Sequence, residues 1–508
     1  MQRFKRFIFN GLLLTAVSLL MRSVAVSFQV YLSNKIGATA MGVFALISTV
    51  YGFALTLGTS GIQLATTKLI SEAFGENEKN ASKSVRELLS KCICYALFFG
   101  ALSFCLLFSL SSFIGVHLLR DARTVLPLRI MSITLIPIAL SSVFNGYFTA
   151  MRRVWKNAAV QVLGEGIRIF SCISLLTLCL PGDVQFACLA VIIGGVIAEL
   201  ISFLIHGSLF LYERRKEKEA AKDSTEQKTE GKLLKIALPV AFSAYVRSAL
   251  VTIEHLLIPR GLEKSGSSRE NALASYGTLH SMVFPLVLFP SALSSSFAGL
   301  LIPEVSEANA RGDRETIIKT IERVFEAVLT YAIGVSGILI CFSEELGGAI
   351  YPKTDAAKFI FMVAPLVPIM YLDTSVDSIL KGLGQQVYHM AINIADSFLS
   401  VILVIILIPR FEVLGYVMTV YFTEIVNASL SIARLFTVVK IRPKIIPWVV
   451  RPVFCVIVST FVTKLFIGRF GHFSTETLSV AAHVLLAASL YLLLTVIFKR
   501  VKKSKTGC

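Results

Sequence analysis

The sequence predicts an all-α polytopic membrane protein with about fourteen transmembrane helices, arranged as two parallel six-helix lobes plus two C-terminal helices. Three observations predict this class. Only 16% of the 508 residues are charged and the mean hydropathy is +0.74, whereas about 25% of the residues in a soluble domain are charged. Apolar stretches recur that reach the roughly 20 residues needed to cross a bilayer. A pattern in the first of these stretches returns 225 positions later.

The candidate spans follow one another with mostly short polar connections. They lie near residues 8–33, 40–64, 91–116, 125–150, 157–180, 185–211, 233–259, 272–302, 323–350, 357–383, 386–409, 412–438, 446–468 and 475–498. Prolines interrupt three of them, at Pro127 and Pro137, Pro285 and Pro290, and Pro365 and Pro368. Such breaks are tolerated in a membrane where neighbouring helices or a polar cavity satisfy the freed backbone groups.

The formal charge of +17 comes from basic residues at the ends of the apolar spans. Alternate loops carry most of them; Arg152, Arg153 and Lys156 share one such loop. A positive-inside distribution explains this pattern better than nucleic-acid binding does. We therefore expect a multi-pass protein of the cell (cytoplasmic) membrane. The first apolar stretch has no clear small-x-small cleavage site and runs on to Leu32, so we also expect an uncleaved first span. Both termini should be cytoplasmic, and nucleic acid should not be a partner.

The repeated pattern centres on an arginine inside an apolar span. Residues 16–32 resemble residues 241–257, and Arg22 matches Arg247. The other matches are Ala16 with Ala241, Ser18 with Ser243, Ser23 with Ser248, Val26 with Val251 and Leu32 with Leu257, and Gln29 falls opposite Glu254. An arginine in hydrocarbon costs about 3 kcal/mol, so two of them in equivalent places indicate a paired functional feature. Chance similarity, or structural arginines that snorkel to an interface, are the alternatives.

Further matches extend the repeat over most of the chain. Ser71-Glu72-Ala73 resembles Ser306-Glu307-Ala308, and Glu199 in the sixth span corresponds to Glu424 in the twelfth. Six spans are an even number, so two such lobes share one orientation in the membrane. The predicted parts are an N-terminal lobe (1–212), a charged cytoplasmic linker (213–232), a C-terminal lobe (233–440), two additional helices (441–498) and a basic cytoplasmic tail (499–508). The linker is interpreted as solvated, with a regulatory or lipid-head-group role as the alternative.

Motifs for enzyme chemistry are missing from the sequence. It contains no HExxH, GxSxG or CxxC pattern, and the segment GGAIYPKT at Gly347–Thr354 has Pro352 where a Walker A loop needs its second glycine. The nine cysteines lie mostly within apolar spans and have no metal-ligand spacing. We expect neither an enzyme nor a metal site nor a cofactor.

Ionisable residues at the depth of the bilayer are the positive signal. Besides the paired arginines and Glu254, they are Glu165, Arg168, Glu199, Glu424, Asp373, Asp377 and Asp396; the neutral Gln29, which falls opposite Glu254 in the repeat, is a further candidate for the same cavity. Residues of this kind usually face a cavity or one another and mark a transport pathway. Mutual neutralisation is the alternative; Glu165 and Arg168, three residues apart, could pair on one helix face. Arginines suit an anionic, phosphate-bearing cargo. The carboxylates could balance charge or couple transport to the membrane potential or to an H⁺ or Na⁺ gradient.

Taken together, the two lobes, the two additional helices and the helix-one arginine resemble the multidrug/oligosaccharidyl-lipid/polysaccharide (MOP) exporter superfamily. Within it, the chain resembles the stage V sporulation protein B and polysaccharide biosynthesis flippase group. Ser248–Leu262, SALVTIEHLLIPRGL, is particularly similar to the seventh helix of that group. The resemblance covers essentially the whole chain, but its motifs are diffuse.

The resemblance implies a V-shaped, alternating-access transporter that moves undecaprenyl-pyrophosphate-linked sugars across the cytoplasmic membrane. Peptidoglycan, spore cortex or another surface polysaccharide would use them, and cell-wall synthesis proteins could be partners alongside membrane lipids. The related lipid II flippases carry S-R-x-x-G-F-x-R-D in helix one, where residues 21–29 here keep only Arg22. Their eighth-helix arginine has no counterpart in Tyr276–His280, YGTLH. We therefore hypothesise that Arg247 supplies the second cation. The alternatives are a cation-coupled multidrug exporter and a non-transporting scaffold for envelope assembly.

Overall fold

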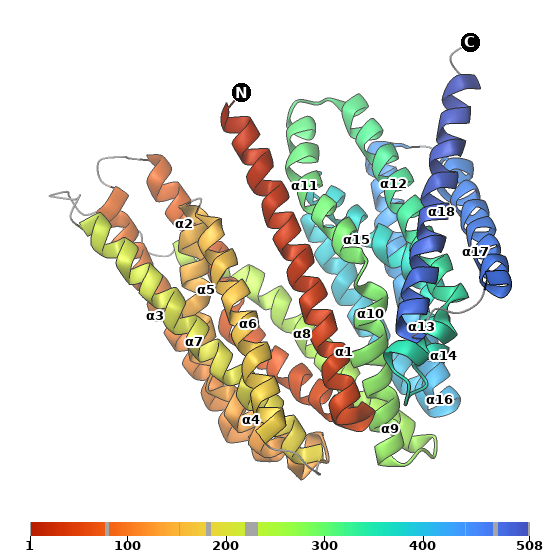
Figure 1. Cartoon of the computed structure of the whole chain (residues 1–508). Coiled ribbons are helices and arrows are strands. Elements are labelled where there is room, and N and C mark those ends of the chain that lie inside the picture. The colour runs from red at the N-terminus through yellow and green to blue at the C-terminus, as the bar shows by residue number, and fades with distance from the viewer. Residues whose placement is uncertain are drawn as a thin grey trace. The chain divides into compact units, whose positions relative to one another are not determined.

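The computed structural model describes residues 2–76, 81–151, 153–178, 184–218, 232–441, 443–470 and 476–505 (Figure 1). Within these ranges every regular element is a helix, which confirms the all-α class. In the part of the chain that the structure describes, ten helices are long and apolar enough to cross a membrane, or up to eleven if the bent pair Ala122–Ser132 and Leu135–Ala150 forms one span. The chain is therefore a multi-pass membrane protein, and the orientation of its termini stays a prediction.

Two very long helices explain part of the difference between this number and the predicted fourteen. α1 (Gln2–Thr59) has 58 residues and α16 (Gln386–Val439) has 54. Either would measure roughly 80 Å at 1.5 Å per residue, well beyond a hydrocarbon core of about 30 Å. Each contains one residue with non-helical backbone angles, Gly37 in α1 and Glu412 in α16. The exact number of fourteen crossings is not confirmed.

The chain forms two compact units. Unit 1 consists of Met1–Met21 and Thr39–Pro259, and unit 2 of Arg22–Ala38 and Arg260–Cys508. These units differ from the predicted lobes 1–212 and 233–440 in where they place residues 22–38 and 233–259. The predicted boundaries themselves stay a prediction, and most of the predicted linker, residues 219–231, lies outside the described residues.

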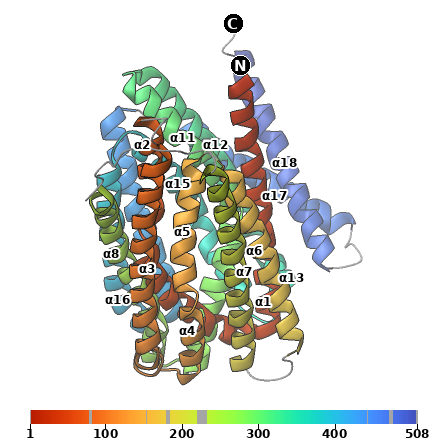
Figure 2. The same ribbon diagram turned by 90° about the vertical axis from the view of Figure 1, so that its left-hand side faces the viewer.

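Unit 1 is a bundle of mostly antiparallel helices. Besides parts of α1, it contains α2 (Ile62–Glu76), α3 (Ala81–Phe113), a π-helical turn (Ile114–Leu118), a 3-10 turn (Ala122–Thr124), α4 (Val125–Ser132), α5 (Leu135–Ala150), α6 (Val154–Leu178), α7 (Val184–Lys218) and most of α8 (Lys232–Lys264). Helices α2 and α3 pack against α5, and α6 packs along α7 (Figure 2). The core between them is aromatic: the rings of Phe144 and Phe210 lie 4.6 Å apart, and Tyr147 and Phe148 are buried beside them.

Unit 2 contains the remaining helices and the segment of α1 from Arg22 to Ala38. In chain order they are α9 (Arg269–Tyr276), a π-helical stretch (Gly277–Val283), α10 (Phe284–Leu288), α11 (Ser291–Ala310), α12 (Arg314–Cys341), α13 (Ser343–Ile350), α14 (Ala356–Val363), a 3-10 turn (Ala364–Leu366), α15 (Val367–Gly382), α16, a π-helical turn (Ile446–Val450), α17 (Arg451–Phe470) and α18 (Glu476–Lys505). Helix α15 packs between α11, α12 and α16.

Local sequence explains why α12 forms and which face it buries. Asp313 caps its first turn, because its carboxylate accepts hydrogen bonds from the Thr316 amide at 3.0 Å and the Thr316 hydroxyl at 2.6 Å. These bonds hold the pKa of Asp313 below its ordinary value. Ile317, Ile321 and Phe325 then recur at every fourth position and are buried on one face of the helix.

The two additional helices, α17 and α18, pack against α12 (Figure 1). Glycines of α12 allow this close approach. A Cβ atom at Gly334 would lie 2.4 Å from the Tyr491 ring of α18, and one at Gly337 would lie 2.4 Å from Val456 of α17. The hydroxyl of Tyr491 donates to the Thr330 carbonyl at 2.5 Å, so the ring is not free to move away. This close packing joins α17 and α18 to unit 2.

A glycine substitution tests this packing. Gly334→Ala should lower the free energy of unfolding by about 1–3 kcal/mol, because the added methyl group overpacks the contact with Tyr491. Gly348→Ala is the matched control, since no atom lies within 4 Å of the Cβ position there. Thermal unfolding of the detergent-solubilised protein would measure both variants. Equal unfolding temperatures for the two would contradict the proposed contact.

Candidate functional site

Arg22 and Gln29 both donate to backbone carbonyls of the interrupted stretch between Gly277 and Ser291. Nη2 of Arg22 lies 3.1 Å from the Leu288 carbonyl and 3.3 Å from the Ser291 hydroxyl oxygen. Nε2 of Gln29 lies 2.7 Å from the Ser281 carbonyl. The two side chains are seven residues apart, two turns of one helix, and therefore share a face of α1. Both belong to unit 2.

These carbonyls need partners because the helix is irregular. A π-helical stretch and Pro290 interrupt it, and proline has no N–H to donate. Around Leu288 the amide of Ala292 bonds Phe289 instead, and the Ser291 hydroxyl donates to the Leu288 carbonyl at 2.6 Å. An unsatisfied carbonyl in an apolar environment costs several kcal/mol. Arg22 and Gln29 remove part of that cost.

Three buried or half-buried tyrosines also donate hydrogen bonds to backbone carbonyls of this interrupted stretch. The hydroxyl of Tyr371 donates to the Val287 carbonyl at 2.8 Å, that of Tyr331 to Pro290 at 2.9 Å and that of Tyr351 to Met282 at 3.2 Å. Sequence reasoning missed these three residues. The available signal was a tyrosine inside an apolar span, because a buried phenol needs a hydrogen-bond partner.

The charge of Arg22 is not balanced by these contacts. Its partners are a carbonyl and a hydroxyl, and within the described residues it forms no ion pair. The side chain is half-buried. A guanidinium keeps its proton in a protein, so Arg22 remains a cation that can still attract an anionic group.

Arg247 lies in α8 and belongs to unit 1. Its side chain is exposed, and neighbouring residues hold α8 against α1: Tyr245 donates to the Leu57 carbonyl at 3.1 Å and Ser248 to the Thr56 hydroxyl at 3.2 Å. Glu254 follows on the same helix and is half-buried. The joint action of Arg22 and Arg247 stays a prediction, because the two residues belong to different units.

Three further predicted residues lie together in unit 1. Glu165 and Arg168 form an ion pair on α6, as their spacing predicted. Glu199 of α7 has both as charged neighbours. The group combines two carboxylates with one guanidinium, so the ion pair of Glu165 with Arg168 neutralises one of the two negative charges.

The other four predicted carboxylates form a group in unit 2, called here the carboxylate cluster: Asp373 and Asp377 of α15 with Asp396 and Glu424 of α16. Each is an electrostatic neighbour of others in the group. Asp373 is only 8% exposed; its Oδ2 accepts from Asn427 at 3.0 Å, and its Oδ1 has no hydrogen-bond partner in the described part of the chain.

Two polar residues that contact the carboxylate cluster were not predicted. His389 Nδ1 lies 2.9 Å from Asp377 Oδ1, and Asn427 contacts Asp373. Helical spacing was the available signal: Asn427 follows Glu424 by three residues, and His389 precedes Asn393 by four. No group of three or more His, Cys, Asp or Glu side chains in the searched ranges has the geometry to hold a metal ion. Carboxylate and imidazole groups can bind and release protons, and this is the chemistry that these side chains offer.

A sequence profile described as polysaccharide biosynthesis protein matches residues 8–309, more than half of the chain. The chain belongs to this polysaccharide biosynthesis protein family. It is 24% identical to the stage V sporulation protein B of Bacillus subtilis (strain 168) over 509 residues, covering 98% of this chain and 96% of the relative. It is 21% identical to the lipid II flippase MurJ of the same organism, covering 80% and 78%.

Solved structures share the fold of this polysaccharide biosynthesis family member. The lipid II flippase MurJ in an inward closed conformation has a TM-score of 0.72 at 15% identity, covering 96% of this chain and 99% of that chain. An inward-facing multidrug resistance MATE family transporter of the MOP superfamily has a TM-score of 0.68 at 12% identity, covering 84% and 98%. At these identities the two structures show a shared fold, and the family profile together with the curated relatives confirms the predicted resemblance to the polysaccharide biosynthesis flippase group.

Removing one tyrosine hydroxyl tests the role of the carbonyl bonds in this family member. Tyr371→Phe should lower the free energy of unfolding by about 1–3 kcal/mol, because it leaves the buried Val287 carbonyl without its donor. Tyr212→Phe removes the hydroxyl of an exposed tyrosine and should have no measurable effect. Thermal unfolding in detergent compares the two. A Tyr371→Phe protein as stable as the control would show that the carbonyl has another donor.

Proposed function

We propose that the chain is an alternating-access flippase or exporter for an undecaprenyl-pyrophosphate-linked oligosaccharide or peptidoglycan precursor. The cargo would cross the cytoplasmic membrane for cell-wall, spore-cortex or surface-polysaccharide synthesis. The observation that carries this proposal is Arg22, a half-buried cation on an apolar helix whose partners are neutral. Pyrophosphate is the complementary charge, and guanidinium binds its oxygens bidentately.

The relatives support the same cargo class. One bears the name lipid II flippase and another the name stage V sporulation protein B. The family description names polysaccharide biosynthesis. Arg247 is the proposed second cation and Glu254 and Gln29 are proposed to line the same path. A lipid-linked glycan is therefore the proposed substrate, and cell-wall synthesis proteins are proposed partners.

Charge variants of the two arginines test the cargo. Arg22→Gln and Arg247→Gln should each lower the flipping rate about tenfold or more, the size of one charge-assisted hydrogen bond to phosphate. Arg22→Lys should retain more activity than Arg22→Gln, because it keeps the charge. Lys35→Gln and Lys264→Gln remove exposed charges from the same two helices and serve as matched controls. The measurement is leaflet-resolved accumulation of labelled lipid-linked precursors in cells depleted of the native protein.

The outcomes separate the proposal from its alternatives. Normal flipping by both glutamine variants would remove the anionic-cargo argument. Normal flipping by Arg247→Gln alone would remove only the pairing of Arg22 with Arg247. Loss of cationic drug efflux with flipping unchanged would favour the multidrug exporter, and a depleted strain that still moves every precursor and drug would favour the scaffold.

The carboxylate cluster is proposed to couple transport to an H⁺ or Na⁺ gradient or to the membrane potential. Four carboxylates lie together with His389, and Asp373 is nearly buried. At low dielectric the repulsion between neighbouring carboxylates is strong, so binding a proton or a cation changes the energy of the group considerably. The group of Glu165, Arg168 and Glu199 is proposed to balance charge in unit 1 rather than to bind cargo, because two of its members already pair.

Neutral replacements test the coupling. Asp373→Asn and Glu424→Gln should abolish the acceleration of flipping by an imposed pH gradient or potential, since each charge moved contributes about 2.3 kcal/mol per 100 mV. Flipping without a gradient should change little. Glu344→Gln, an exposed carboxylate of unit 2, is the control. Reconstituted vesicles with and without imposed gradients give both rates. Gradient-driven acceleration that survives in both variants would place the coupling elsewhere.

A further inference from the structure

Arg129 lies in a preformed cradle at one end of unit 1. Its Nε donates to the Ser111 hydroxyl at 3.0 Å and its Nη2 to the Ser112 hydroxyl at 2.8 Å. The guanidinium carbon lies 5.7 Å from the centre of the Phe108 ring, within the range of a cation–π contact. All three partners come from the last turns of α3. The guanidinium of α4 is therefore held in one orientation.

The surface around this guanidinium is apolar. Leu126 and Ile133 precede and follow Arg129 by three and four residues, so they share its face of the helix. Their side chains are 49% and 48% exposed, and Phe108 is 43% exposed. Arg129 itself is exposed on the same face. In a membrane protein an exposed apolar face of this kind contacts lipid.

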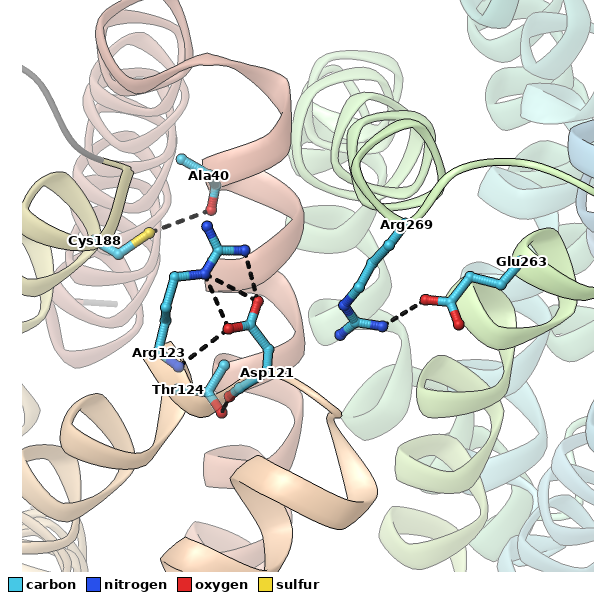
Figure 3. A network of polar contacts seen from close by, with 7 residues as sticks. All are labelled: Ala40, Asp121, Arg123, Thr124, Cys188, Glu263 and Arg269. Carbon is cyan, nitrogen blue, oxygen red and sulfur yellow. Dashed lines mark hydrogen bonds and ion pairs between the residues drawn. The ribbon is translucent and has the colours of Figure 1, made fainter.

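The positive charge of Arg129 has no counter-charge in the described protein. Within the described ranges Arg129 forms no ion pair. Asp121 is the only acidic residue between Glu87 and Glu165 in the sequence. Its carboxylate is already engaged by Arg123, whose Nε and Nη2 approach it at 2.9 and 2.8 Å (Figure 3).

We propose that Arg129, Ser112 and Phe108 form a binding site for the phosphate group of a membrane phospholipid. An arginine at a lipid-facing position is costly unless an anion accompanies it, and the phosphate diester is the anion that lipid itself supplies. The serines occupy Nε and Nη2, which leaves Nη1 for a phosphate oxygen. The Ser112 hydroxyl accepts from Arg129, so its own hydrogen can donate to a second oxygen.

Arg129 lies near the start of its helix. It is the fifth residue of α4, about 6 Å along the helix axis from the first. Long arginine side chains near helix ends of membrane proteins reach the interfacial region where lipid head groups lie. The acyl chains would then cover Leu126, Ile133 and Phe108. This site is separate from the proposed cargo path, and it does not depend on the identity of the cargo.

Native mass spectrometry of the whole purified protein tests the proposal. The protein is exchanged into detergent containing equal amounts of phosphatidylglycerol and an uncharged diacylglycerol, which share acyl chains but differ in the phosphate. The native protein should retain phosphatidylglycerol in preference. Arg129→Gln should lower that preference about tenfold, the size of one charge-assisted hydrogen bond. Arg129→Lys should keep part of it, because the charge remains but the planar fork is lost.

Two further variants keep the test decisive. Ser112→Ala leaves the arginine and its charge in place, and it should lower the preference for phosphatidylglycerol by a smaller factor. This variant replaces Arg129→Gln as the test if the Arg129→Gln protein does not fold. Arg86→Gln, which removes an exposed arginine from the opposite end of α3, should leave the preference unchanged. Unchanged retention in Arg129→Gln or, where that protein does not fold, in Ser112→Ala would overturn the proposal. So would an equal loss in Arg86→Gln, or equal retention of both lipids by the native protein.

Discussion

The backbone carbonyls between Ser281 and Pro290 impose a constraint on the rest of unit 2. This stretch is interrupted by a π-helical segment and by Pro290, so its carbonyls cannot all be satisfied within the helix. In a bilayer no water is available to replace the missing donors. Side chains must therefore reach the stretch from other helices, and the positions of those helices follow from where the carbonyls point.

Five side chains donate hydrogen bonds to these carbonyls, and they come from four separate parts of the chain. Arg22 and Gln29 reach from α1, Tyr331 from α12, Tyr351 from the turn after α13 and Tyr371 from α15. Residues 22–38 of α1 are therefore tied to unit 2, although the rest of α1 belongs to unit 1. Arg22 combines this structural role with an unbalanced charge, which is the property that an anionic cargo would use.

Charge is treated differently at other places in the molecule. In unit 1 the pair of Glu165 and Arg168 neutralises itself, and Arg123 holds Asp121. The carboxylate cluster of unit 2 contains four acidic groups; His389 contacts Asp377, and Lys381 is an electrostatic neighbour of Asp373. At Arg129 the excess charge is positive, because the partners of its guanidinium are neutral serine hydroxyls on an apolar surface. The proposed binding of ions, cargo and lipid would use these excess charges, because a single added charge changes the energy of such a site strongly at low dielectric.

The sequence by itself determined the fold class, the interruption at Pro290 and the set of charged residues within the spans. Apolar run length, proline and rare buried charges are local features, so these predictions need no knowledge of packing. Only the tertiary structure decided which carbonyls Arg22 and Gln29 bind, that tyrosines share this task, and that Asp373, Asp377, Asp396 and Glu424 form one group. It also joined residues 22–38 to unit 2. The physical reason is that hydrogen-bond partners far apart in the chain depend on how helices pack, which no local pattern specifies.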